Sequence, residues 1–86
     1  MEINWSNKAY KQIKKLPRNN QIMIFDAVTR LSDFDKAEPI RAVRKLTNHQ
    51  YGYRLRVANY RVLFDVDDIV RIISIQEVKK RNERTY

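Results

Sequence analysis

Apolar and polar residues alternate along most of the stretch from residue 51 to residue 78, YGYRLRVANYRVLFDVDDIVRIISIQEV. Alternation with a period of two places successive side chains on opposite faces of a β-strand. The pattern therefore predicts a meander of three antiparallel strands joined by two tight turns. We expect the first turn at Ala58-Asn59, with Asn59 able to take positive φ, and the second at Asp67-Asp68.

The first turn fixes how its two strands pair. A two-residue loop places Val57 opposite Tyr60, and therefore Arg56 opposite Arg61. Like charges that face one another on a sheet are destabilising. We therefore expect an anionic partner for this face, and phosphate is the natural candidate because Arg binds it through two parallel hydrogen bonds. A two-residue second turn would also place Ser74 opposite Arg61. The other face is apolar and is expected under the helices. In the first two strands it carries Tyr53, Leu55, Val57, Tyr60, Val62, Phe64 and Val66.

The N-terminal half of the chain has helical spacing of apolar residues in two segments. Ser6 is a good N-cap for the first helix, and Pro17 ends that helix and can open the next at its first position. The elements expected before the meander are a strand at residues 1–5, helices at 7–16 and 18–31, a loop at 32–39 and a short strand at 41–46.

Together these elements predict one α+β domain over residues 1–86, with the order β-α-α-β-β-β-β. An N-terminal strand and a two-helix hairpin would pack on an antiparallel sheet. A short basic tail, KKRNERTY at residues 79–86, would follow the last strand and reach the face that carries the arginines.

The charge balance narrows the class of partner. The chain has 18 Lys and Arg against 10 Asp and Glu, a net charge of +8, which suits nucleic acid or an acidic protein. Without cysteine there is no disulfide framework and no thiolate zinc site. No apolar run approaches the roughly 18 residues of a membrane span, and the N-terminus lacks the apolar core of a signal peptide. We therefore expect a cytoplasmic protein with no membrane partner.

Several polar residues have an ordinary structural interpretation. Arg54 and Arg56, taken alone, are typical of the solvated face of a strand. His49 is the only histidine, which excludes a pair of catalytic histidines within the chain, and it is more typical of a loop residue. The acids Asp65, Asp67 and Asp68 fit a hairpin turn better than a metal site. No metal or other cofactor is predicted.

The pattern YRLRVANYRVLFDV, followed by an apolar strand and by VKKRNERTY, resembles the RelE/ParE superfamily of bacterial toxin–antitoxin toxins. The segments KQIKKLP and RKL are similar to that family as well, so the resemblance covers nearly the whole chain. RelE-like members are ribosome-dependent endoribonucleases that cleave mRNA in the A site. ParE-like members share the fold but act on DNA gyrase and are not nucleases.

The resemblance implies roles for particular residues. The implied catalytic residues are Arg56, Arg61, Lys80, Arg81 and Tyr86. The implied RNA-binding residues are Arg54, Lys79 and Lys45. Arg56 and Arg61 would hold the scissile phosphate, Lys80 or Arg81 would serve the leaving oxygen, and Tyr86 would stack on a base or contact the phosphate. RelE-like members usually have Lys where this chain has Arg54 and Arg56. A guanidinium is a poor base, so the identity of the general base is left open.

The resulting prediction is the toxin of a toxin–antitoxin pair, a metal-independent endoribonuclease that cleaves translated mRNA on the ribosome. Its expected partners are the ribosome, mRNA and an antitoxin with an acidic or amphipathic segment. Two alternatives stay open: a ParE-like inhibitor of gyrase, and a basic nucleic-acid-binding or repressor module.

Overall fold

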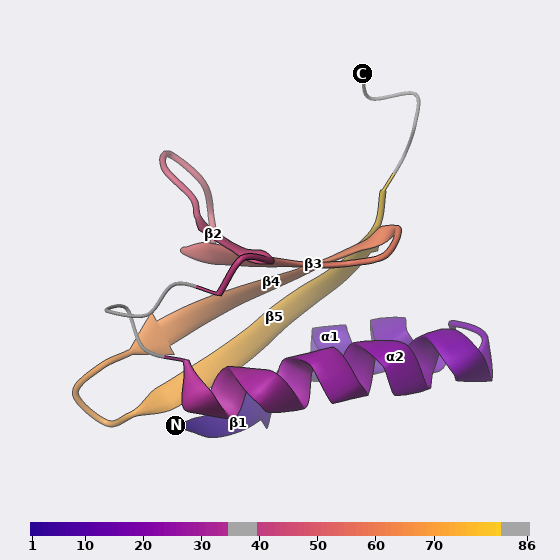
Figure 1. The fold of residues 1–86 in the computed structure, drawn as a ribbon, viewed down its shortest axis with the longest axis horizontal. Helices are drawn as coiled ribbons and strands as arrows, with labels where there is room; N and C mark the ends of the chain where they lie inside the picture. The colour runs from indigo at the N-terminus through magenta and orange to yellow at the C-terminus, as the bar shows by residue number, and fades with distance from the viewer. Residues whose placement is uncertain (35–39, 82–86) are drawn as a thin grey trace.

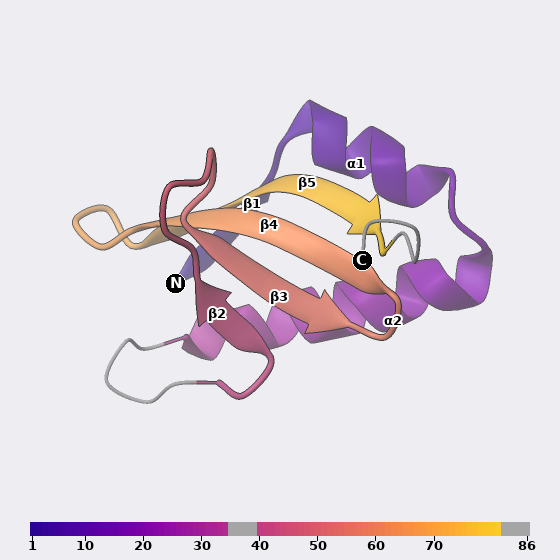
Figure 2. The ribbon, with the colours of Figure 1, turned by 90° about the horizontal axis from the view of Figure 1, so that it is seen from above.

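The computed structural model describes residues 1–34 and 40–81. They form a five-stranded sheet with both helices on one side, and the opposite face of the sheet is open (Figure 1; Figure 2 views the sheet from above). The sheet order is β1-β5-β4-β3-β2. The elements are β1 (Glu2–Trp5), α1 (Asn7–Lys14), α2 (Arg18–Thr29), the 3-10 helix η1 (Arg30–Asp33), β2 (Val43–Lys45), β3 (Tyr53–Val57), β4 (Tyr60–Asp67) and β5 (Ile72–Lys80).

The predicted α+β class and element order are confirmed, with shifts at the ends of elements. Ser6 caps α1 as expected, because its Oγ accepts the N–H of Ala9 at 3.0 Å. Pro17 is the N-cap of α2 and not its first helical residue. The sheet is mixed and not wholly antiparallel, since β1 pairs in parallel with β5. None of the helices in the described ranges is both long and apolar enough to cross a membrane.

The core lies between the helices and the apolar face of β3, β4 and β5. Val62 and Phe64 are fully buried there, as the alternation predicts. Phe64 stacks on Tyr53 at 5.4 Å between ring centroids. Phe34 places its ring edge against both, although the sequence pattern assigned it to a loop. Tyr60 faces the helices too, and its hydroxyl accepts a 2.8 Å hydrogen bond from Asn20 of α2.

The hairpin of β3 and β4 has the predicted register, with Val57 opposite Tyr60 and Arg56 opposite Arg61. Its turn differs in one detail. The positive φ, 50°, belongs to Ala58 and not to Asn59. The loop length therefore fixed the pairing even though the left-handed conformation falls on the less permissive residue.

The hairpin of β4 and β5 does not have the predicted register. Asp67 pairs with Ile72, so the loop comprises residues 68–71 and not Asp67-Asp68. A β-bulge lies opposite Leu63 and Phe64, where Leu63 pairs with Glu77 and Phe64 with Ile75. Both irregularities move the partner of Arg61 from Ser74 to Lys79. The predicted Ser74 pairing is wrong because alternation cannot reveal a longer loop or an inserted residue.

Candidate functional site

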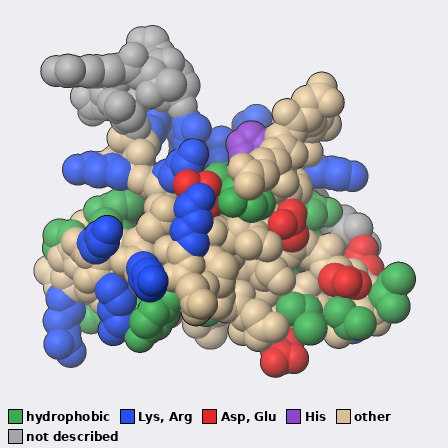
Figure 3. All heavy atoms as spheres, turned by 180° about the vertical axis from the view of Figure 1, so that it is seen from behind, with side chains coloured by type: hydrophobic (Ala, Val, Ile, Leu, Met, Phe, Trp, Pro, Cys, Tyr) green, Lys and Arg blue, Asp and Glu red, His purple; other side chains and the backbone are tan. Residues whose placement is uncertain are grey.

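Basic side chains gather on the open face of the sheet. We call this the basic face, and it comprises Arg44 of β2, Arg54 and Arg56 of β3, Arg61 of β4, Lys79 of β5 and Arg81 just beyond β5. In Figure 3, Lys and Arg side chains lie along the upper side of the molecule, where the open face of the sheet is. A second group lies lower down, over the helices. The four strands β2 to β5 contribute to the face, because a basic residue of each points away from the core.

The strand pairings arrange these cations in two rows. One row runs across three strands, since Arg61 pairs with Arg56 on one side and with Lys79 on the other. The second row places Arg44 opposite Arg54. Neighbouring strands are about 4.8 Å apart, and residues two apart along a strand are separated by about 7 Å. Cations at these spacings repel one another and together create a strongly positive surface.

Arg54 is the residue whose pKa shows the effect of this positive surface. Its pKa is lowered from the ordinary value of Arg, first by burial and then by the charges of Arg44, Arg61, Arg56 and Arg81. Its Nε is buried and has no hydrogen-bond partner among the described residues. A buried donor without an acceptor is costly, and an anion at this position would satisfy it while neutralising the repulsion.

A loop stands above the basic face at one end. Residues 46–52, between β2 and β3, rise from the open side of the sheet (Figure 1). The base of the loop is fixed by Asp65, whose Oδ1 accepts the N–H of Gly52 at 2.7 Å. A Cβ at Gly52 would lie 3.3 Å from that same oxygen, so glycine permits the close approach. Gln76 donates to the other oxygen of Asp65 at 3.3 Å. This carboxylate is therefore engaged in holding the loop.

His49 and Asp67 have local roles. His49 lies in the same loop, as predicted, and its Nδ1 accepts the N–H of Tyr51 at 3.1 Å. Asp67 accepts the N–H groups of Ile69 and Val70 at 3.0 and 3.2 Å, which stabilises the turn into β5. Within the described ranges, no group of three or more His, Asp or Glu side chains could hold a metal ion.

The structure brings together only some of the residues singled out in the sequence. Arg54, Arg56, Arg61, Lys79 and Arg81 share the basic face. Lys45 pairs with Tyr53 and Lys80 with Tyr60. Both tyrosines are buried on the helix side, so the two lysines lie on the opposite face of the sheet from the arginines. Tyr86 lies outside the described residues.

Sequence reasoning missed Arg44 in favour of its neighbour Lys45. The predicted strand at residues 41–46 contained the signal, because Arg44 and Lys45 must face opposite ways. Choosing between them required the pairing of this strand with β3, which places Arg44 opposite Arg54. That pairing spans a loop whose length gives no register from sequence.

Comparison with known proteins identifies the fold. No family model matches the sequence, and no curated protein matches it. Among solved structures, the archaeal RelE–RelB complex from Pyrococcus horikoshii has a TM-score of 0.77 at 22% identity, covering 95% of this chain and 96% of that chain. The isolated RelE toxin of E. coli gives 0.77 at 18% identity, covering 95% and 85%. The YoeB–YefM complex from Staphylococcus aureus gives 0.66 at 25% identity, covering 95% and 98%. The chain therefore has the fold of RelE-like toxins.

Proposed function

We propose that this protein is the toxin of a toxin–antitoxin pair and a ribosome-dependent endoribonuclease that cleaves translated mRNA in the A site. One observation carries the proposal. The row Arg56, Arg61 and Lys79 lies beside Arg54, whose buried Nε has no partner among the described residues. A phosphodiester would supply negative charge beside these cations and an acceptor oxygen for the Nε of Arg54.

The chemistry asks three things of the site. The 2′-OH of the RNA attacks the adjacent phosphate, so a proton must leave that oxygen, charge must be stabilised on the phosphorane, and the departing 5′-oxygen must gain a proton. We assign charge stabilisation to Arg56 and Arg61, which lie directly opposite each other. Arg81 is the better placed of the two residues considered for the leaving oxygen, since Lys80 belongs to the other face of the sheet.

Proton abstraction is not assigned to the arginines. A guanidinium stays protonated under all ordinary conditions and is a poor base. The basic face therefore acts as a preorganised electrostatic site, and the proton acceptor comes from Tyr86, from the substrate or from the ribosome. Tyr86 keeps the role implied by the resemblance, a contact with a base or with the phosphate.

The proposed partners follow from charge. With a net charge of +8, the chain suits an antitoxin that has an acidic or amphipathic segment and orders on binding. Several solved structures with this fold are toxin–antitoxin complexes, with RelB in those from Pyrococcus horikoshii and Methanococcus jannaschii and YefM in the one from Staphylococcus aureus. The basic face also suits mRNA and ribosomal RNA, where phosphate contacts supply affinity without sequence choice.

The test is brief induction in cells followed by mapping of mRNA 5′ ends. New ends within translated codons are expected, and they should disappear when translation initiation is blocked. DNA damage with intact mRNA would instead identify a gyrase inhibitor. Growth and intact mRNA during strong expression of the lone chain would contradict the proposal of a toxin.

A further inference from the structure

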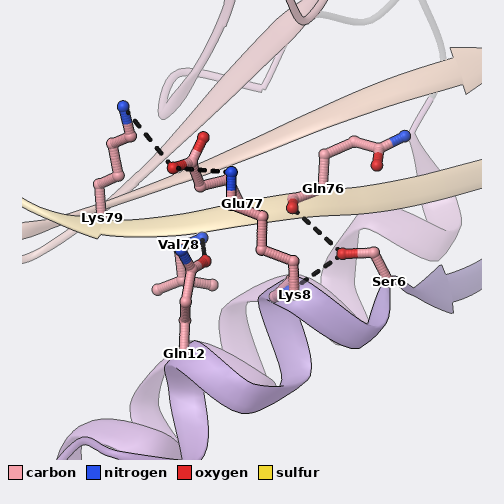
Figure 4. A network of polar contacts seen from close by, with 8 residues as sticks. Ser6, Lys8, Gln12, Gln76, Glu77, Val78 and Lys79 are labelled. Atoms are coloured by element: carbon pink, nitrogen blue, oxygen red, sulfur yellow. Dashed lines mark hydrogen bonds and ion pairs between the residues drawn. The ribbon is translucent and has the colours of Figure 1, made fainter.

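Glu77 is an acidic residue at the edge of the basic face. It belongs to β5, pairs with Leu63 and is only 8% exposed. Its Oε1 lies 3.7 Å from Nζ of Lys79 and 3.5 Å from Nζ of Lys8 (Figure 4). Burying a carboxylate is costly unless cations compensate it, so the position of Glu77 depends on these two ammonium groups.

The two lysines approach from different elements. Lys8 comes from α1, which is fixed against the outer edge of β5 by side-chain hydrogen bonds. Gln12 accepts the N–H of Val78 at 2.7 Å, and Ser6 donates to the carbonyl of Gln76 at 3.1 Å. Lys79 comes from β5 itself, two residues beyond Glu77 on the same face. Glu77 therefore lies between Lys8 of the fixed helix α1 and Lys79 of the basic face.

The β-bulge gives this arrangement its geometry. Ile75 and Val78 are both buried in the core although two residues, Gln76 and Glu77, separate them. In a regular strand the faces would alternate without interruption, and Lys79 would then share the face of Ile75. The bulge resets the alternation, so that Glu77 and Lys79 both lie on the open side and Lys79 pairs with Arg61.

Electrostatic repulsion disfavours the position of the Lys79 side chain opposite Arg61. Lys79 faces Arg61, which already faces Arg56, so repulsion favours other rotamers of a long and flexible side chain. We infer that Glu77 is a positioning residue for the proposed phosphate site: its carboxylate holds the ammonium of Lys79 in line with Arg61. The inference rests on the proposed function, and it assigns to Lys79 contact with the RNA phosphate.

This role predicts that a substitution of Glu77 affects RNA binding and RNA cleavage differently. Removing the charge of Glu77 makes the basic face more positive, so the affinity for single-stranded RNA should stay the same or rise. Cleavage should fall, because Lys79 is no longer held where charge develops on the phosphate. Displacing a catalytic group by about 1 Å can cost up to roughly 100-fold in rate.

The experiment is a double-mutant cycle on programmed ribosomes, with Glu77→Gln, Lys79→Met and the combined variant. Each single variant should lower the single-turnover cleavage rate by roughly 10–100-fold, and the combined variant should be no slower than Lys79→Met alone. Asp26→Asn is the matched control. It removes one negative charge from α2 and the exposed ion pair with Arg30 of η1, and the variant should cleave like the parent chain.

A second measurement does not depend on activity. NMR relaxation of the lysine side chains should show Lys79 ordered in the parent chain and freely mobile in Glu77→Gln. Lys80, on the opposite face, is the internal reference and should be unchanged. Lys79→Met keeps the experiment decisive if Glu77→Gln proves unstable in a thermal melt, because Lys79 is exposed.

The outcomes distinguish this inference from the proposed function. If Arg61→Ala abolishes cleavage while Glu77→Gln cleaves like the parent chain, or if the losses at Glu77 and Lys79 add, the positioning role is wrong and the nuclease stands. If the parent chain does not cleave mRNA at all, the proposed function is wrong. In that case a Lys79 that is equally mobile with and without Glu77 removes the positioning role as well.

Discussion

The two hairpins that build the sheet differ in how directly the sequence encodes them. In the β3–β4 hairpin a two-residue loop sets the pairing, and every expected partner is observed. In the β4–β5 hairpin a longer loop and a bulge shift the partner of Arg61 by five positions, from Ser74 to Lys79. Turn length is local chemistry, whereas the bulge accompanies the docking of α1 against the edge of β5. The pairing across a two-residue turn can be read from the sequence, whereas alternation reveals neither a longer loop nor an inserted residue.

The largest expected effect tests the residue at which the two hairpins meet. Phe64 pairs with Tyr53 in one hairpin and with Ile75 in the other, and it is fully buried. Phe64→Ala should lower the free energy of unfolding by about 3–5 kcal/mol, because it leaves a cavity under both. Urea denaturation measures this. A change below 1 kcal/mol would mean that the face assignment of β4 is inverted, and Arg71→Lys in the exposed turn is the neutral control.

The next effect concerns the cations that the two hairpins share. Arg61→Ala should reduce cleavage on programmed ribosomes by roughly 10²–10³-fold, the usual result of losing one preorganised charge-stabilising donor. Arg61→Lys should recover only part of the rate, because an ammonium lacks the planar fork.

A thermal melt of the same Arg61 variants separates chemistry from folding. The side chain belongs to the open face, so its loss leaves the core intact and removes a repulsion with Arg56. Stability should therefore be unchanged or slightly higher. Full cleavage by a well-folded Arg61→Ala protein would remove the basic face as the site of the reaction.

A smaller effect tests the hydrogen bonds that fix α1 to the irregular strand. Gln12→Ala removes the acceptor of the Val78 N–H, and a buried donor left without a partner costs about 1–3 kcal/mol. Lys11→Ala, on the exposed side of the same helix, is the control and should be neutral. Urea denaturation of both variants gives the comparison; equal stabilities would show that α1 does not fix the edge of β5.

The smallest effect sharpens the comparison at the turn of the regular hairpin. Ala58 has φ of 50°, a conformation that glycine adopts without strain. Ala58→Gly should raise stability by about 0.5–1 kcal/mol, whereas Asn59→Gly should lower it slightly, because Asn59 has no positive φ to relieve. Thermal melts of the two variants test this. If Asn59→Gly were the more stable variant, the left-handed conformation would belong to Asn59 and not to Ala58.

The contrast between the regular β3–β4 hairpin and the irregular β4–β5 hairpin also explains which parts of the site were predictable. Arg54, Arg56 and Arg61 were found from alternation and one turn, since all three lie in the regular hairpin. Lys79 was singled out through the family resemblance, but its place opposite Arg61 depends on the bulge. Arg44 was missed because its pairing crosses a loop that carries no register signal. The burial of Phe34 in the core was not predicted, because a single apolar residue among turn formers shows no periodicity.

The parallel pairing of β1 with β5 has a consequence for synthesis of the chain. Ile3 lies beside Ile73, so β1 can pair only after β5 has been made. β5 supplies Ile73, Ile75 and Val78 to the core and Lys79 to the basic face. Contacts so distant in sequence form late, because the loop between them must close first. A ribosome making this protein therefore carries a nascent chain that lacks both a finished core and a finished basic face until β5 emerges.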